Sequence, residues 1–209
     1  MCLVYLGGIT PIAPEKRPAH VCVTPAAPEE ESTIANLLEL CAHDFSEFHP
    51  LELQANGRFG YQHLSPYWSE PERYPFLVKV DGRLAGLVLV TRGSEISGIQ
   101  SVWDFGEFFI LRAYRRQGIG MNVAHHLWQR FPGRWEVRVM QANCTALKFW
   151  QHAISTFTGE QVRPYFFRKN GTRWHMFAFD CEQAASQMAR ADHSTLGTVD
   201  GLTRTSEVQ

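Results

Sequence analysis

Arginine and glycine residues gather in the segment R-R-Q-G-I-G over residues 115–120. An apolar strand-like run ends just before this segment and a helix-like apolar period follows it, so the glycines are expected where a helix begins. The first amides of a helix lack intrahelical partners and carry partial positive charge, which suits them to bind a diphosphate. Arg115 and Arg116 would add charge-assisted hydrogen bonds. The segment therefore predicts a phosphate-binding turn.

Two common phosphate-binding motifs do not fit this turn. A dinucleotide-binding fold needs a third glycine in the pattern G-x-G-x-x-G, and Val123 stands at that position. A P-loop needs Gly-Lys-Ser or Gly-Lys-Thr, and neither tripeptide follows. The surrounding elements must therefore decide the class.

The elements around the turn predict an α/β chain. Apolar and β-branched runs favour strands over 103–111 and 134–140, and apolar residues at every fourth position favour a helix over 118–131. The dipeptide Asp81-Gly82 favours a two-residue hairpin turn. The other predicted elements are a strand over 20–24, a helix over 28–48, a long aromatic loop over 51–74, a hairpin of 76–80 with 83–91, a helix over 145–154 and a hairpin of 163–168 with 173–180.

Length and composition predict one domain over 20–181, with an N-terminal extension over 1–19 and a polar C-terminal tail over 182–209. The 20 Lys and Arg against 21 Asp and Glu leave no basic excess for bulk nucleic-acid binding. No apolar run approaches the roughly 18 residues that a membrane span needs. The five scattered cysteines include no Cys-x-x-Cys and the nine histidines no His-Glu-x-x-His, so we expect no metal and a reducing cytoplasm.

A second motif makes the pattern specific. The run N-C-T-A-L-K-F-W over 143–150 opens the helix that follows strand 134–140. With the turn over 115–120, it resembles the acetyl-coenzyme A (acetyl-CoA) core of the GCN5-related N-acetyltransferase (GNAT) superfamily, whose motifs have the forms Q/R-x-x-G-x-G/A and N-x-x-A-x-x-F-Y. The motifs cover about residues 100–156, and the order of elements extends the match to roughly 20–180. The resemblance implies a mixed α/β (α+β) fold of the acyl-CoA N-acyltransferase type, in which a central mixed sheet with flanking helices is splayed between strands 103–111 and 134–140.

The resemblance also implies how acetyl-CoA, as co-substrate, is held. The diphosphate would lie at the turn and the first helical residues, which are Arg115, Arg116, Gln117, Gly118, Ile119, Gly120 and Met121. The backbone of Ile110 and Leu111 would pair with the pantetheine arm as with an added strand. Asn143 would bond to pantetheine or, equally, cap its own helix. Phe149 and Trp150 would complete the site.

Trp150 departs from the family pattern, which usually has tyrosine there. That tyrosine is commonly taken to protonate the departing thiolate, whereas an indole N–H is not a usable acid at neutral pH. Tyr165 or another hydroxyl is one replacement. The other, which we favour, is departure of the thiolate without a proton, because a thiol pKa of about 8.5 makes it a tolerable leaving group.

Three acidic residues are alternatives for the general base, because an ammonium must lose a proton before its nitrogen can attack a thioester. Asp104 lies 11 residues before Arg115, where histone-acetylating members of the family place their glutamate. Glu107 stands where many other members have an acid, and Glu136 lies on the next strand. Strict alternation puts Asp104 and Glu107 on opposite faces, so we expect at most one of them in the cleft.

The implied activity is acetyl transfer to a primary amine by direct attack in a ternary complex. A small-molecule amine is the expected acceptor, because the loop over 51–74 offers Tyr61, Tyr67, Trp68 and Tyr74 as pocket walls, with Glu47, Glu52, Glu70 and Glu72 to attract a cation. Packing of these aromatics onto the sheet is an equal alternative. A protein or peptide N-acetyltransferase and an inactive CoA-binding sensor are the rival functions. A homodimer is left open, and no nucleic-acid or membrane partner is expected.

Overall fold

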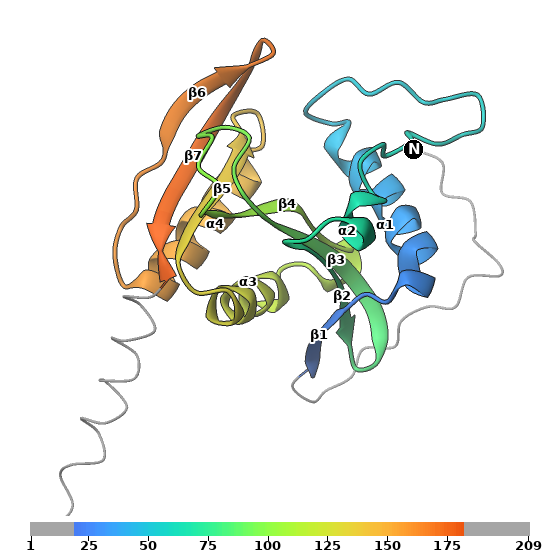
Figure 1. Ribbon diagram of the computed structural model, residues 1–209, viewed down its shortest axis with the longest axis horizontal. Coiled ribbons are helices and arrows are strands. Elements are labelled where there is room, and N and C mark those ends of the chain that lie inside the picture. Colours follow the sequence, from blue (N-terminus) through green and yellow to red (C-terminus); the bar gives the residue numbers. More distant parts are fainter. Residues whose placement is uncertain (1–18, 182–209) are drawn as a thin grey trace, which may run out of the picture.

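Seven strands form one mixed sheet at the centre of the molecule (Figure 1). The computed structural model describes residues 19–181, so the predicted extension and tail lie almost wholly outside the described residues. The strand order is β1-β2-β3-β4-β5-β7-β6, and β4 with β5 is the one parallel pair in the described sheet. The strands are β1 (Val21–Pro25), β2 (Arg73–Val80), β3 (Arg83–Arg92), β4 (Trp103–Ile110), β5 (Arg134–Met140), β6 (Tyr165–Lys169) and β7 (Thr172–Asp180). The predicted mixed α/β class is confirmed.

Four α-helices and two 3₁₀ turns connect these strands. They are η1 (Pro28–Glu30), α1 (Glu31–Phe45), α2 (Pro66–Ser69), η2 (Arg112–Tyr114), α3 (Ile119–Arg130) and α4 (Cys144–Thr158). The predicted loop over 51–74 is confirmed up to residue 72, with α2 as its short helical piece, and β2 already begins at Arg73. Helix α4 runs past the expected end at residue 154, because Phe157 continues its buried face. Gly159, in the left-handed conformation, then ends the helix.

Both predicted hairpins form with two-residue turns. Asp81 and Gly82 have φ of 50° and 77°, and Asn170 and Gly171 have φ of 49° and 77°. Two successive positive φ values match the right-handed twist of the flanking strands, which is why Asp-Gly and Asn-Gly are favoured there. These turns set the register of β2 against β3 and of β6 against β7.

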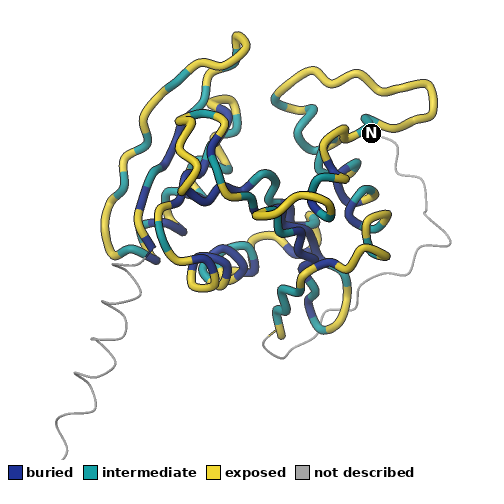
Figure 2. The backbone as a smooth tube through the Cα atoms, in the orientation of Figure 1, coloured by how far each residue is buried: buried dark blue, intermediate teal, exposed yellow. Residues whose placement is uncertain are grey.

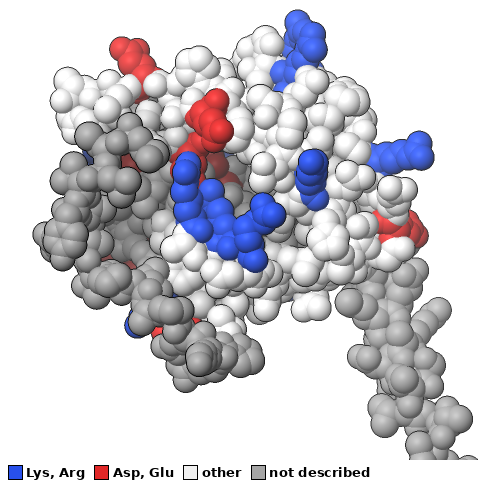
Figure 3. Space-filling view, turned by 180° about the vertical axis from the view of Figure 1, so that it is seen from behind, with Lys and Arg blue, Asp and Glu red and all other residues white. Residues whose placement is uncertain are grey.

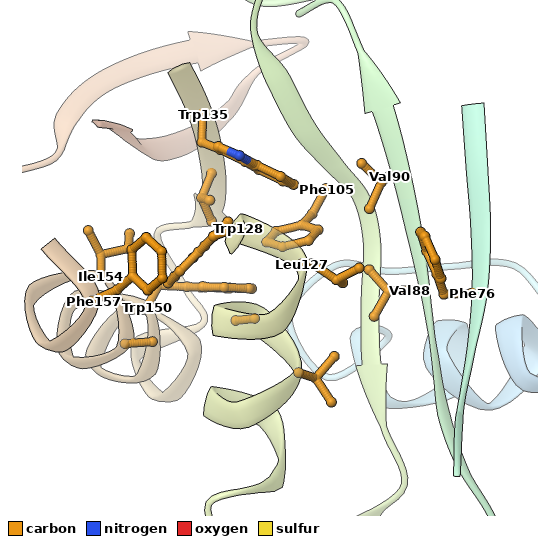
Figure 4. Packing of buried hydrophobic residues seen from close by; sticks show 14 of the residues in the cluster. Phe76, Val88, Val90, Phe105, Leu127, Trp128, Trp135, Trp150, Ile154 and Phe157 are labelled. Atoms are coloured by element: carbon orange, nitrogen blue, oxygen red, sulfur yellow. The ribbon is translucent and has the colours of Figure 1, made fainter. Parts of the chain in front are cut away.

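The sheet has a separate apolar core on each face. Helix α1 packs Ile34, Leu37 and Leu38 against alternate residues of β2, β3 and β4. Helices α3 and α4 cover the other face, where Trp128, Trp150 and Phe105 approach one another (Figure 4). Buried positions follow the sheet and the inner helix faces, whereas much of the loop before α2 is exposed (Figure 2).

Strands β4 and β5 separate soon after they meet. The register joins Trp103 to Trp135 and Asp104 to Glu136, and no later pair follows in the described sheet. The rest of β4 and β5 therefore diverges, as the resemblance implied.

Candidate active site

A cavity of about 440 Å³ occupies the gap between β4 and β5. Backbone and side chains of both strands line it, helix α1 and the aromatic loop wall it on one side, and α4 closes it on the other. Its lining includes Phe45, Tyr61, Glu107, Phe108, Arg138 and Trp150. A cavity of this size at a strand gap is suited to a small ligand and the arm of a cofactor.

A β-bulge in β4 changes which side chains face this cavity. Leu89 pairs with Glu107 and the next residue, Val90, pairs with Phe105, so Gly106 is the extra residue of the bulge. Because Leu89 and Thr91 lie on the α1 face, their partners Glu107 and Asp104 lie there too. The expectation that the two acids occupy opposite faces is wrong, because the inserted residue restores them to the same face.

Asp104 is buried and already paired. It is 1% exposed, and its Oδ2 accepts a hydrogen bond from Nη1 of Arg138 on β5. Its Oδ1 is buried without a hydrogen-bond partner among the described residues. Burial raises the pKa of Asp104 to about 7 against the opposing effect of the Arg138 charge. Asp104 therefore does not line the cavity surface but supports the residue that does.

Glu136 is also buried, beside Asp104 on the same face. It is 1% exposed, and its Oε2 accepts a hydrogen bond of 3.1 Å from the hydroxyl of Ser97. It does not line the cavity. Of the three candidates, Glu136 is therefore the least suited to act as the general base.

Glu107 is the base candidate that lines the cavity. The Tyr61 hydroxyl interacts with its carboxylate, and the Cys41 sulfur lies 4.0 Å from its Oε2. Burial raises the pKa of Glu107 to about 7, while Arg138 and Tyr61 oppose the rise. A carboxyl group with a pKa near neutrality is well matched to taking a proton from an ammonium.

The predicted phosphate-binding turn leads into α3 as expected. Gly118 is the N-cap in the left-handed conformation with φ of 77°, and no side chain caps the helix. Gly120 packs so closely that a Cβ there would lie 3.3 Å from the ring of Phe149. Open amides and a close backbone approach fit a diphosphate at this helix start. A hollow of about 630 Å³ lies beside it, with Gln117, Gly118, Ile119 and Met121 among its lining residues.

Arg115 turns away from this helix start and forms contacts inside the protein. Its Nε donates to the Ile110 carbonyl at 2.7 Å, and its Nη2 pairs with Oδ2 of Asp44 on α1 at 2.5 Å. Arg112 pairs with Oδ1 of the same carboxylate at 2.7 Å. Figure 3 shows basic side chains gathered beside acidic ones on the back of the molecule. Arg116 is exposed, with φ of 63°, and stays a candidate for the diphosphate.

Asp44 was not among the sequence candidates. Its pKa is held below the usual value by its hydrogen bonds to Arg112 and Arg115, which outweigh partial burial. No sequence spacing indicates this contact, because α1 and the turn after β4 are about 70 residues apart. The ion pairs tie the helix that walls the cavity to the turn that would hold the diphosphate.

The backbone of Leu111 is not available to pair with pantetheine, which corrects that expectation. Its N–H donates to the Ala85 carbonyl at 2.8 Å, and its carbonyl accepts from Tyr114 N–H at 2.9 Å. The Ile110 carbonyl is taken by Arg115. Since Leu111 turns toward β3, strand alternation turns Ile110 and Phe108 toward the gap, so the Phe108 backbone becomes the better candidate.

Asn143 acts as the N-cap of α4. Its Oδ1 accepts a hydrogen bond of 2.9 Å from Ala146 N–H, which is the capping role foreseen as the alternative to pantetheine binding. Asn143 also lines the cavity.

We expect Asn143→Ala to lower the free energy of unfolding by about 1 kcal/mol, because α4 loses its cap. Urea unfolding measures this loss, and CoA titration measures the second role separately. A variant with native stability would contradict the capping role.

Trp150 lies inside the apolar core and against the cavity. It is 6% exposed, stacks on Phe105 at a centroid distance of 5.3 Å and meets Phe108 edge to face. Tyr165, the named alternative acid, is 46% exposed on β6 and does not line the cavity. Tyr61 is the tyrosine that lines the cavity.

The aromatic loop forms less of the pocket than expected. Tyr61 lines the cavity, whereas Tyr67 is buried against the sheet and Tyr74 packs with Trp103 and Phe131 on the opposite face. A Cβ at Gly106 would lie 2.4 Å from the Tyr67 hydroxyl, so that hydroxyl presses on the bulge. Of the four acids, Glu70 pairs with Arg73 and Glu72 with Arg92, and neither they nor Glu47 and Glu52 line the cavity.

No group of three or more His, Cys, Asp and Glu side chains within 19–181 is placed to hold a metal ion. No helix in that part of the chain is long and apolar enough to cross a membrane.

Comparison with known proteins identifies the family. Residues 34–154, more than half of the chain, match the acetyltransferase (GNAT) family, so the chain belongs to that family. This confirms the resemblance seen in the two motifs and the expected enzyme class, an acetyltransferase. No curated protein matches the chain.

Solved structures share the fold at low sequence identity. An acetyltransferase from Thermus thermophilus is 13% identical, with a TM-score of 0.58 over 77% of this chain and 96% of that one. The spermidine N-acetyltransferase of Vibrio cholerae, solved with CoA and spermine, is 14% identical, with a TM-score of 0.54 over 79% and 98%. NAA60 of Arabidopsis thaliana, solved with a bisubstrate analogue, is 16% identical, with a TM-score of 0.50 over 77% and 98%. Because these neighbours were solved with different ligands, the acceptor of this chain must be inferred from its own site.

Proposed function

We propose that the protein transfers an acetyl group from acetyl-CoA to the primary amine of a small molecule, with Glu107 as the general base. One observation carries the proposal: of the three acids on β4 and β5, Glu107 alone lines the cavity where these strands part. The open amides at the start of α3 support the proposal further, because they suit the diphosphate of acetyl-CoA.

The residues of the site divide the reaction between them. Acetyl-CoA supplies the acetyl group as a thioester, which an amine nitrogen can attack directly. The Glu107 carboxylate accepts a proton from the acceptor ammonium, and the freed nitrogen then forms a bond to the carbonyl carbon while the carbon–sulfur bond breaks. The second amine proton passes to the thiolate or to solvent. The Phe108 backbone, on the open edge of β4, is placed to orient the carbonyl oxygen.

The cavity walls favour a compact amine with an apolar body. Phe45 and Leu51 line the cavity with apolar side chains, and Tyr61 adds an aromatic ring and a hydroxyl. Glu107 supplies the negative charge that a cationic amine requires. The spermidine N-acetyltransferase among the structural neighbours acts on a small polyamine, which supports a small-molecule acceptor.

Trp150→Phe is expected to leave kcat within about threefold of the wild type, because the indole stacks in the core and is no acid at neutral pH. The variant keeps the aromatic contact with Phe105. Single-turnover measurement of the chemical step decides the matter. A loss of 100-fold or more, with intact CoA binding, would show that the indole takes part in the chemistry.

Thiol release from acetyl-CoA across a panel of amines tests the proposed function. The panel contains polyamines, arylalkylamines, amino acids and peptides with free N-termini. We expect acetylation of at least one small amine in preference to the peptides. Preference for peptides would favour a protein acetyltransferase, and CoA binding without turnover of any amine would favour a sensor.

A further inference from the structure

One guanidinium, that of Arg138, lines the cavity and pairs with a buried carboxyl group behind its wall. Arg138, on β5, lines the cavity and binds Asp104 across the gap, next to the point where β4 and β5 last pair. The Gly106 bulge brings Glu107 to the same face as Asp104. Arg138 is the cationic residue among those that line the cavity. The bulge therefore creates a cluster of two carboxyl groups and one guanidinium that strict alternation would have prevented.

Few other charges face this cluster. The groups around Glu107 are Asp104 on β4, Arg138 on β5, Cys41 on α1, Tyr61 in the loop and Tyr67 on α2. Glu136 and Glu95 act on Asp104 from further away. Glu136 is held by Ser97, and Glu95 is paired with Lys169 at 3.2 Å. Arg138 is thus the cation that acts on both central carboxyl groups.

The two carboxyl groups differ in what they can do with a proton. Asp104 is buried with one oxygen committed to Arg138, so its ionised form is matched by a fixed positive charge. Glu107 has no such ion pair among the described residues, and it faces the cavity. Two buried acids that share a site push each other toward the neutral form, and a cation fixed on one of them separates their roles.

We propose that Arg138 is a positioning residue that holds Asp104 in an ion pair and so leaves Glu107 as the group that takes the acceptor proton. This inference rests on the proposed function, since it explains how that function's base is selected. In each turnover the proton moves from the ammonium to Glu107 while the Arg138–Asp104 pair stays intact. Asp104 acts through Arg138 and Glu107 and does not touch the acceptor.

The proposal predicts opposite effects for the two partners. Arg138→Met removes the cation that favours ionisation of Glu107, and the effect of Arg138 on Glu107 exceeds that of Asp104, so the acidic limb of the kcat/KM profile shifts to higher pH, by up to about one unit. Asp104→Asn removes the competing anion and leaves Arg138 to act on Glu107, so the limb shifts to lower pH. The double variant Asp104→Asn/Arg138→Met brings the limb back toward its original position. Arg138→Lys, which keeps the charge, restores most of the wild-type profile.

Two measurements on the full chain test this. The first is the kcat/KM profile with an amine found active in the panel. The second, which needs no acceptor, is NMR titration of the ¹³C-labelled carboxyl groups, assigned with Asp104→Asn and Glu107→Gln. Lys79→Met is the matched control, because Lys79 forms an exposed strand ion pair with Glu30 at 3.8 Å far from the cavity. The control is expected to move neither readout.

The outcomes separate this inference from the proposed function. Shifts of the same sign in Arg138→Met and Asp104→Asn, or no shift of the Glu107 signal in either, would overturn the inference even if amines are acetylated. If Arg138→Met does not fold, the inference can still be tested by comparing the pH of the acidic limb in Asp104→Asn and in the double variant. If the pKa values of the carboxyl groups shift as expected but no amine is acetylated, the proposed function is wrong and the inferred charge arrangement stands.

Discussion

Glu107→Gln is expected to lower kcat/KM for the amine by roughly 10²- to 10⁴-fold near neutral pH while leaving the affinity for acetyl-CoA nearly unchanged. The glutamine keeps the size of the side chain and a contact for Tyr61 but cannot accept the proton. The matched control is Glu136→Gln, a buried acid on the same face that does not line the cavity. Equal losses in both variants would mean that Glu107 has a structural role.

The pH dependence follows from the same carboxyl group. With a pKa of about 7, Glu107 is protonated below neutrality, so kcat/KM falls about tenfold per pH unit on the acidic side. Stability changes in the opposite sense. Because the folded-state pKa is raised, ionisation of Glu107 above the unfolded value near 4.3 destabilises the fold, and the loss is complete once the pH exceeds 7. Glu107→Gln is therefore expected to melt at a higher temperature than the wild type at pH 8 and at about the same temperature at pH 4.

Gly120→Val is expected to weaken CoA binding by about 100-fold, which corresponds to about 2.7 kcal/mol. The space for a Cβ is already limited by the Phe149 ring at 3.3 Å, and branching at that position would block the approach of a diphosphate to the amides of α3. His152→Val, at an exposed position of α4 that lines neither the cavity nor the hollow beside α3, controls for the β-branched residue. Affinity equal to that of the wild type, in a variant with native stability, would place the diphosphate elsewhere.

Local patterns predicted the fold because each element is specified by nearby residues. Asp81-Gly82 and Asn170-Gly171 adopt the positive φ values that fix the two hairpins. Gly118 occupies the helix start where the motif predicted a phosphate site. These features depend on a few consecutive residues, so a single sequence reveals them.

The arrangement of the acids could not be read in the same way. A glycine inside a strand, as at Gly106, is a known sign of a bulge, but strict alternation ignored it and so separated Asp104 from Glu107. Arg138 between Val137 and Val139 was a further sign, because a charged residue in the middle of a buried strand needs a partner. The Asp44 contact with Arg112 and Arg115 left no local sign, since it depends on where α1 packs.

The most direct test of the account is titration calorimetry of the full chain with acetyl-CoA and with CoA. We expect saturable binding of each at one molecule per chain, sharply weakened by Gly120→Val and retained by Glu107→Gln. Absence of binding up to about 1 mM ligand, a concentration that would detect even the weak free energy of about −4 kcal/mol, would contradict it.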